Sequence, residues 1–274
     1  MPSERWSLIL GVSSGFGAAT ALELARAGSH IIGVHLDRKA TLPAVEQSAA
    51  QIRQLGRQAR FFNMNAADPE RRKEVLDAMK SETAHGPVRL HVVMHSLAFG
   101  TLLPYVGGRS VASAASAGGG GAAGLTQSQM EMTLDVMAHS LVYWVQDLVS
   151  QGFLQRGGRV YAMTSEGSSR VWAAYGAVSA AKSALESHIR QLAMELAPQG
   201  ITVNTIRAGV TDTPALRKIP GWEEMLKTAA ARNPSGRTTT PQDIGRAIVA
   251  LSHEGTSWIT GNVINVDGGE FITG

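Results

Sequence analysis

A tyrosine and a lysine seven residues apart, Tyr175 and Lys182, are the side chains of this sequence best suited to chemistry. The segment from Thr164 to Glu186 reads as the end of a buried strand, a short loop and a long amphipathic helix. Seven residues make about two helical turns, so we expect both side chains to leave one helix face. A phenol and an ammonium placed together could hold a cofactor and protonate a substrate. Taken alone, the pair fits the rim of an ordinary helix better, so the elements around it must decide.

Composition narrows the class of protein. The 274 residues are 44% hydrophobic, which is enough for a large core, and α/β sheets of this length often form one unit. A formal net charge of +3 is too small and too evenly spread to predict nucleic-acid binding. The absence of cysteine excludes disulfides, thiolate catalysis and cysteine-based zinc sites. No apolar run resembles a secretory signal or approaches the ~20 residues that span a bilayer, so we expect a cytoplasmic protein without membrane contact.

A glycine-rich turn stands near the N-terminus. An apolar run at residues 6–10, typical of a strand buried on both faces, is followed by Gly11, Gly15 and Gly17 and then by a helical pattern that stops at Gly28. Glycines permit a tight turn and a close backbone approach, and the helix N-terminus offers free N–H groups to a phosphate. The strand–turn–helix context makes this a predicted nucleotide site.

The second strand, residues 30–36, bears on the choice of cofactor. In dinucleotide folds an acidic residue at the end of this strand takes the ribose hydroxyls, and a basic residue accommodates a 2′-phosphate. His35 stands where the acid would be, and Asp37 is followed by Arg38 and Lys39. This order favours NADP(H), with Arg38 at the phosphate, over NAD(H). The competing interpretation is an ordinary solvated loop.

Strands and helices alternate along the rest of the chain. Strands are expected at 58–63, 88–95, 158–163, 200–206 and 262–266, with helices at 41–55, from 68, at 127–151, between 214 and 232, and from 241. His91 and His95 share a face of the fourth strand, but their Cα atoms would lie ~13 Å apart, so no metal site is predicted. Residues 105–125, rich in Gly, Ala and Ser, read as a flexible insertion, either a lid or a plain surface loop. The pattern predicts one doubly wound α/β domain over residues 1–274, Rossmann-like, with a seven-stranded parallel sheet flanked by helices.

These residues together resemble the short-chain dehydrogenase/reductases along essentially the whole chain. That resemblance implies a nicotinamide cofactor, and it implies homotetramers. The matching features are the turn at Gly11, Gly15 and Gly17, the Asn65 turn, the strand around Asn204, the Gly209–Thr213 turn and Asp267-Gly-Gly269. The implied cofactor-binding residues are Gly11, Ser13, Ser14, Phe16, Gly17, Arg38, Asn65, Ala66, Ser96, Leu97, Lys182, Gly209, Val210 and Thr213.

The expected active site is not the usual one of that family. Most members carry Tyr-x-x-x-Lys, but the residue four before Lys182 is Val178, which has no proton to give. Tyr175 instead forms Tyr-x6-Lys, and His95-Ser-Leu-Ala-Phe99 replaces the ordinary Asn-Asn-Ala-Gly. This combination resembles the enoyl-acyl-carrier-protein reductases of bacterial fatty-acid synthesis.

The enoyl reductase resemblance implies roles for the pair. Hydride would go to the β-carbon of an enoyl thioester, and Tyr175 would stabilise the enolate oxygen, which lies farther from the nicotinamide than the oxygen of a ketone. Lys182 would bind the nicotinamide ribose, and its charge would lower the pKa of the phenol. Val210 and Thr213 would hold the carboxamide. Phe99, Gly100, Tyr175 and Leu216 would contact the substrate.

Two departures keep alternatives open. Ser165 occupies the place of the ordinary family's catalytic serine, so a carbonyl, 3-ketoacyl or hydroxysteroid reductase that uses Ser165 with Tyr175 stays in view. Glu223 and Glu224 stand in a helix that is often basic where an acidic acyl carrier protein docks, which makes that partner a weaker inference than an enoyl thioester. A different class is a non-catalytic NADP(H)-binding sensor.

Overall fold

Seven apolar segments form one parallel sheet in the order β3-β2-β1-β4-β5-β6-β7. The computed structural model describes residues 5–81, 87–108 and 123–273. Every residue of β1 and β2 is buried, so this sheet must be covered on both faces. The predicted Rossmann-like α/β fold is confirmed. The strands are β1 (Trp6–Leu10), β2 (His30–His35), β3 (Ala59–Asn63), β4 (Leu90–His95), β5 (Leu154–Thr164), β6 (Thr202–Ala208) and β7 (Val263–Val266).

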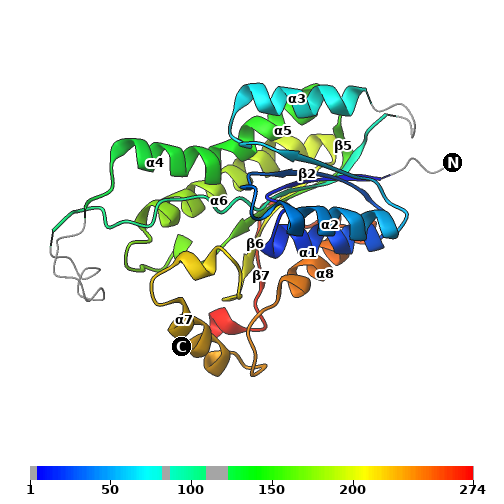
Figure 1. Ribbon diagram of the computed structural model, residues 1–274. Helices are drawn as coiled ribbons and strands as arrows, with labels where there is room; N and C mark the ends of the chain where they lie inside the picture. The colour runs from blue at the N-terminus through cyan, green and yellow to red at the C-terminus, as the bar shows by residue number, and fades with distance from the viewer. Residues whose placement is uncertain (1–4, 82–86, 109–122, 274) are drawn as a thin grey trace.

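Helices cover the two faces as separate layers, each with its own hydrophobic core (Figure 1). One layer holds α1, α2 and α8, and the other holds α3, α4, α5 and α6. The short helix α7 lies off both layers, beyond the carboxyl end of β6. The α-helices are α1 (Gly15–Arg26), α2 (Leu42–Gln54), α3 (Pro69–Lys80), α4 (Gln127–Leu134), α5 (Ser140–Ser150), α6 (Gly176–Leu196), α7 (Trp222–Arg232) and α8 (Pro241–Leu251).

Some element boundaries differ from the sequence prediction. The helix expected at 127–151 is interrupted by a π-helical segment, η1 (Asp135–His139), between α4 and α5. Such π segments occur often at functional sites, and this one lies beside α6. Strand β6 begins at Thr202 rather than at Gly200, because Gly200 has a φ of +69° that ends the preceding turn. Strand β5 begins before the predicted residue 158.

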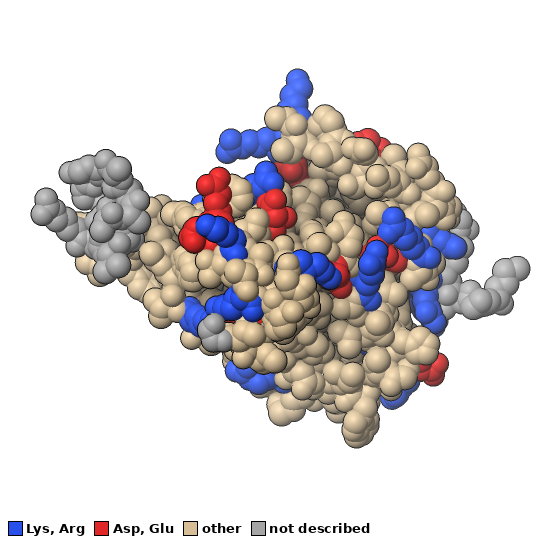
Figure 2. Space-filling model, turned by 90° about the horizontal axis from the view of Figure 1, so that it is seen from below, with Lys and Arg blue, Asp and Glu red and all other residues tan. Residues whose placement is uncertain are grey.

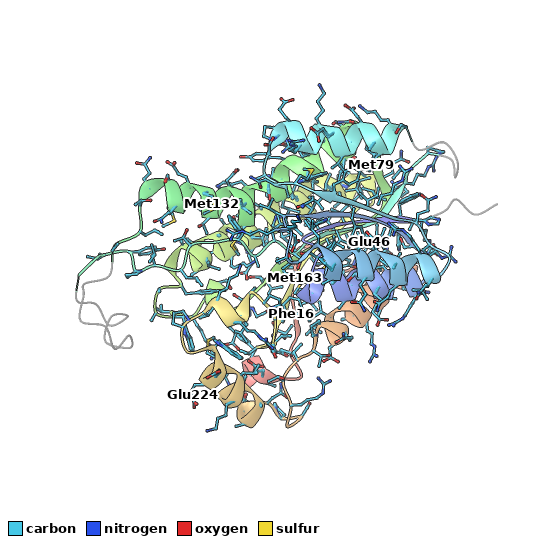
Figure 3. All side chains as sticks on the ribbon, viewed as in Figure 1. Phe16, Glu46, Met79, Met132, Met163 and Glu224 are labelled. Carbon is cyan, nitrogen blue, oxygen red and sulfur yellow. The ribbon has the colours of Figure 1, made fainter. Side chains whose placement is uncertain are left out.

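The strand order reverses between β1 and β4, and a crevice is expected there at the carboxyl ends of the strands. Phe16 of α1 and Met163 of β5 both lie at this place (Figure 3). The predicted insertion lies mostly at residues 109–122, outside the described residues. Its base is closed by a hydrogen bond of 2.9 Å from the Leu125 N–H to the Pro104 carbonyl.

The two histidines of β4 have separate protein partners. The Nε2 atom of His91 lies 2.9 Å from the Ser252 carbonyl, and that of His95 lies 2.9 Å from Ser140 Oγ. No helix in the described part of the chain is both long and apolar enough to cross a membrane.

Candidate active site

A cavity of about 1040 Å³ opens at the carboxyl ends of the strands. The predicted tyrosine, the predicted lysine and the glycine-rich turn all line this cavity, and so do most of the other predicted residues. Gly17 and Arg38 are predicted site residues that do not line it. Those that do are Gly11, Ser13, Ser14, Phe16, Asn65, Ala66, Ser96, Leu97, Phe99, Gly100, Ser165, Tyr175, Lys182, Gly209, Val210, Thr213 and Leu216.

The glycine-rich turn fits a dinucleotide by its shape. Gly11 has a φ of +95°, and a Cβ there would lie 2.5 Å from the Ser96 carbonyl oxygen, so only glycine lets the two strand ends approach this closely. Gly17 stands behind the turn, where a Cβ would overlap the Gly11 carbonyl. The Ser14 side chain does not cap α1, which leaves the first N–H groups of the helix for a phosphate.

The adenosine end of the cavity places Asp37, rather than Arg38, on the wall. The Asp37 carboxylate accepts a hydrogen bond of 2.7 Å from the Thr41 hydroxyl and lies 3.0 Å from His35 Nδ1. Burial opposes ionisation of Asp37, but hydrogen bonds from Thr41, Ser13 and His35 outweigh it and lower its pKa. An ionised carboxylate therefore faces the place expected for the ribose.

Tyr175 stands at the start of the helix rather than inside it, and both it and Lys182 line the cavity. It is the N-cap residue of α6, and Ala174 before it has a φ of +60°. Its ring covers Gly167 so closely that a Cβ there would overlap it, and its hydroxyl lies 3.4 Å from Ser165 Oγ. Burial raises the pKa of Tyr175, and the Ser165 contact opposes this only in part. The expectation that the charge of Lys182 lowers the pKa of Tyr175 is therefore wrong, because burial sets the direction of the shift.

Lys182 is almost completely buried, with 6% of its surface exposed. Its Nζ donates a hydrogen bond of 2.8 Å to the Met163 carbonyl at the end of β5. Burial lowers the pKa of Lys182 to about 8, and the negative charge of Glu186 opposes that shift.

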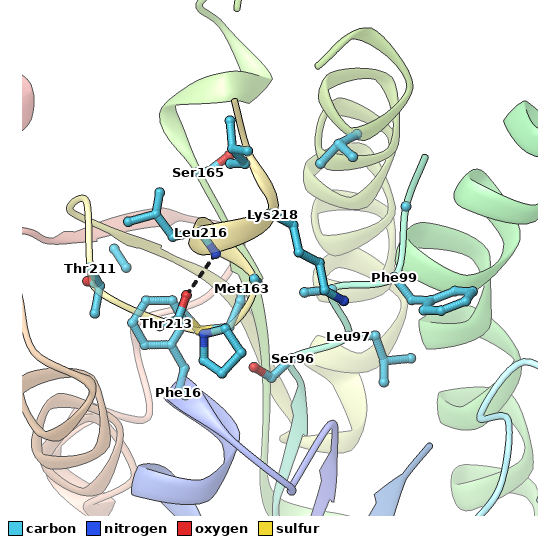
Figure 4. Close-up of a pocket in the computed structure, with 18 of the residues that line it drawn as sticks. Phe16, Ser96, Leu97, Phe99, Met163, Ser165, Thr211, Thr213, Leu216 and Lys218 are labelled. Atoms are coloured by element: carbon cyan, nitrogen blue, oxygen red, sulfur yellow. Dashed lines mark hydrogen bonds between the residues drawn. The ribbon is translucent and has the colours of Figure 1, made fainter. Parts of the chain in front are cut away.

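The remaining wall forms an apolar compartment (Figure 4). Phe99 and Leu97, from the loop after β4, line it together with Leu216 of the short helix η4 (Leu216–Lys218), and Lys218 lies between Leu216 and Phe99 in this view. Gly100 lies against Val178 and Met137, and a Cβ at Gly100 would come within 2.8 Å of both side chains. The compartment has room for an acyl chain but little tolerance for added side-chain volume at Gly100.

Sequence reasoning missed a charged cluster next to the Gly209–Thr213 turn, formed by the buried Glu270 and the partly buried Arg232 and Glu166. Both Glu270 carboxylate oxygens lie 3.2 Å from the Val210 N–H, which is the group predicted for the nicotinamide carboxamide. Arg232 lies 3.8 Å from Glu270 and 3.5 Å from Glu166. Burial raises the pKa of Glu270. Nothing local in the sequence signals this cluster, because its members come from α7, the loop after β5 and the C-terminal segment.

Known proteins of the same kind span almost the whole chain. A profile of the Enoyl-(Acyl carrier protein) reductase family matches residues 11–270. The 1-cyclohexenylcarbonyl-CoA reductase of Streptomyces collinus is 29% identical over 265 residues, which are 96% of this chain and 85% of that protein. The enoyl-[acyl-carrier-protein] reductase [NADH] FabI of Aquifex aeolicus is 29% identical over 187 residues, 68% of this chain and 63% of that protein.

Solved structures of enoyl-[acyl-carrier-protein] reductases have the same fold as this chain. The A. aeolicus enoyl-[acyl-carrier-protein] reductase superposes with a TM-score of 0.81 at 23% identity, covering 99% of this chain and 98% of that one. FabI of Candidatus Liberibacter asiaticus gives 0.82 at 24% identity, covering 98% and 96%. Because the family profile covers residues 11–270, almost the whole chain, the chain belongs to the enoyl-(acyl carrier protein) reductase family of the short-chain dehydrogenase/reductases, a family of NAD(P)H-dependent oxidoreductases.

Proposed function

We propose that this protein reduces the C=C bond of an enoyl thioester with a reduced nicotinamide cofactor. The observation that carries the proposal is the position of Tyr175. Tyr175 lines the cavity from the N-cap of α6, while Val178, at the usual tyrosine position, packs against Gly100 in the apolar compartment. A hydrogen-bond donor set back in this way suits the carbonyl oxygen of an enoyl thioester, which lies several bonds from the carbon that takes hydride.

The proposed chemistry needs a neutral phenol. When bound, the reduced nicotinamide supplies the hydride for the β-carbon, and the C=C electron pair moves toward the thioester oxygen. Because burial raises the pKa of Tyr175, its O–H stays protonated at neutral pH and donates to the developing enolate. Lys182, which lines the same cavity, would hold the nicotinamide ribose. A proton from solvent then completes the α-carbon.

The cofactor we propose is NAD(H), in place of the NADP(H) preference that Arg38 suggested. Arg38 is exposed and off the cavity wall, whereas the ionised Asp37 carboxylate faces the expected ribose. A 2′-phosphate beside this carboxylate would be repelled. The A. aeolicus relative is named as an NADH enzyme.

Asp37→Ala is expected to lower the preference for NADH over NADPH by about tenfold or more, because it removes the repulsion. The measurement is kcat/KM for each cofactor at a fixed enoyl substrate concentration. Arg38→Ala is the matched control and should leave the ratio nearly unchanged. A loss of NADPH activity in Arg38→Ala, with no effect of Asp37→Ala, would restore the NADP(H) assignment.

The carrier we propose is coenzyme A rather than an acidic carrier protein. Helix α7 begins with Glu223 and Glu224, and Glu224 lines the cavity mouth. Figure 2 shows the end of the molecule that includes α7, where basic side chains are interspersed with acidic ones in no continuous basic face. The S. collinus relative is named as a reductase of a CoA thioester.

A side-by-side assay tests the function itself. Crotonyl-CoA, a longer enoyl-CoA, a 3-ketoacyl thioester and a steroid ketone are each offered with NADH and with NADPH. We expect turnover of the enoyl thioesters to exceed that of both ketones. Faster ketone reduction would favour the carbonyl reductase alternative, for which the 3.4 Å contact of Ser165 with Tyr175 speaks. Tight cofactor binding without turnover would favour the sensor alternative.

We also propose a homotetramer in the cytoplasm. Strand β7 is an edge of the sheet, and large apolar side chains stand exposed near it. Trp258, just before β7, is 97% exposed, and Ile272, just after it, is 82% exposed. Exposed apolar groups along a free strand edge are typical of an interface between copies of a chain.

A further inference from the structure

Glu186 lies one helical turn beyond Lys182 on α6 and is shielded from solvent, with 14% of its side chain exposed. Its carboxylate accepts a hydrogen bond of 2.6 Å from the Thr164 hydroxyl. Thr164 directly follows Met163, whose carbonyl accepts the Lys182 ammonium at 2.8 Å. The carboxylate and the ammonium are thus tied to adjacent residues at the end of β5.

The charges around Lys182 come from three neighbouring elements. On α6 itself, Glu186 is the acid that acts on it. From β4, His95 faces it, but burial lowers the pKa of His95 to about 3, so this imidazole is neutral at physiological pH. From β6, Arg207 Nη2 lies 3.6 Å from the Glu186 carboxylate and offsets part of its charge. Tyr175 is neutral at physiological pH, because burial raises its pKa.

We infer that Glu186 is a positioning residue that keeps Lys182 cationic and aimed at the cofactor ribose. This rests on the proposed role of Lys182 in holding the cofactor. A buried ammonium without a nearby carboxylate loses its proton more easily, since burial disfavours the charged form. A neutral amine makes weaker hydrogen bonds to ribose hydroxyls than an ammonium does.

The sign of the pH effect follows from the charge of each form. The pKa of Lys182 is about 8, below the ordinary lysine value, so the cation is present below that pH and lost above it. Removing the negative charge of Glu186 should make Lys182 lose its proton at a lower pH. Removing the positive charge of Arg207 leaves Glu186 uncompensated and moves the loss to higher pH.

The test follows the titration of Lys182 directly. Lysine labelled with 13C at Cε is incorporated, and the Lys182 signal is identified by its disappearance in Lys182→Met. We expect a midpoint near 8 in the unaltered protein. In Glu186→Gln, which keeps an acceptor for Thr164 but removes the charge, we expect a midpoint lower by about one pH unit. Glu195→Gln, the same change at an exposed position of α6, is the matched control and should leave it at about 8.

Three further variants separate charge from packing. Arg207→Met should raise the Lys182 midpoint, whereas Arg207→Lys, which keeps the positive charge, should leave it nearly unchanged. Because water admitted to the site would also raise the midpoint, this pair decides the matter if Glu186→Gln does not fold. Thr164→Val keeps the charge and should leave the midpoint nearly unchanged. An unchanged midpoint in Glu186→Gln, or a lowered one in Arg207→Met, would overturn the inference.

The functional readout is NADH affinity as a function of pH, measured by cofactor fluorescence without any enoyl substrate. In Glu186→Gln the fall in affinity should begin at a lower pH, by the same interval as the NMR midpoint. The titration of Lys182 does not depend on the reaction that the enzyme catalyses. A failure of enoyl reduction would therefore refute the proposed function and leave this inference standing. An unchanged Lys182 midpoint in Glu186→Gln would refute this inference and leave the proposed function standing.

Discussion

Replacing Tyr175 by Phe is expected to lower kcat/KM for enoyl reduction by about 10²–10³-fold, with NADH affinity nearly intact. The phenol hydroxyl is the donor placed to meet the developing enolate, and its removal leaves the ring on Gly167 undisturbed. The loss should fall on kcat, because the hydrogen bond strengthens as charge develops on the thioester oxygen. Steady-state kinetics on crotonyl-CoA at saturating NADH measure this effect.

Ser165→Ala is the companion variant for Tyr175→Phe. The Ser165 Oγ lies 3.4 Å from the phenol oxygen, at the long limit of a hydrogen bond, so in enoyl reduction it should cost far less than the loss of the phenol. Equal losses in the two variants would indicate an acid pair, as a ketone reductase requires. Unchanged enoyl turnover in Tyr175→Phe would contradict the proposal that Tyr175 donates a hydrogen bond to the enolate.

Gly11→Ala is expected to weaken NADH binding by about 100-fold or more. A methyl group at Gly11 would lie 2.5 Å from the Ser96 oxygen and 2.8 Å from the Ser96 carbonyl carbon, so the turn and the end of β4 must separate. Both segments line the cavity where the dinucleotide fits. Isothermal titration with NADH gives the affinity, and thermal unfolding gives the cost in stability.

Gly28→Ala separates crowding from backbone strain. Gly28 has a φ of +98°, close to that of Gly11, but a Cβ there meets nothing within 4 Å. It should therefore cost only the strain of positive φ, about 1–2 kcal/mol, and leave NADH affinity unchanged. Equal loss of NADH affinity in both variants would show that global destabilisation, not the Gly11–Ser96 approach, explains the first result.

The sequence was sufficient for the fold because its signals are local. Apolar runs such as residues 6–10 and 30–35 alternate with helical patterns, and a parallel sheet buried on both faces requires this alternation. Helix starts with Asp68 and Thr240 as N-caps are equally local, since each cap bonds N–H groups two or three residues away. The π-helical segment at Asp135–His139, which contacts α6, has no such local signal in the sequence.

The candidate site also has features that the local sequence reveals and features that depend on the tertiary structure. The Gly11 turn and the Tyr175–Lys182 spacing could be recognised in the chain because each lies within one strand–turn–helix unit. Whether Asp37 or Arg38 lines the cavity could not, because it depends on the contacts that Asp37 makes with Thr41 and His35 in the folded protein. Protonation is a tertiary property as well. Burial raises the pKa of Tyr175 and lowers that of Lys182, and burial exists only once the sheet and both helical layers have assembled.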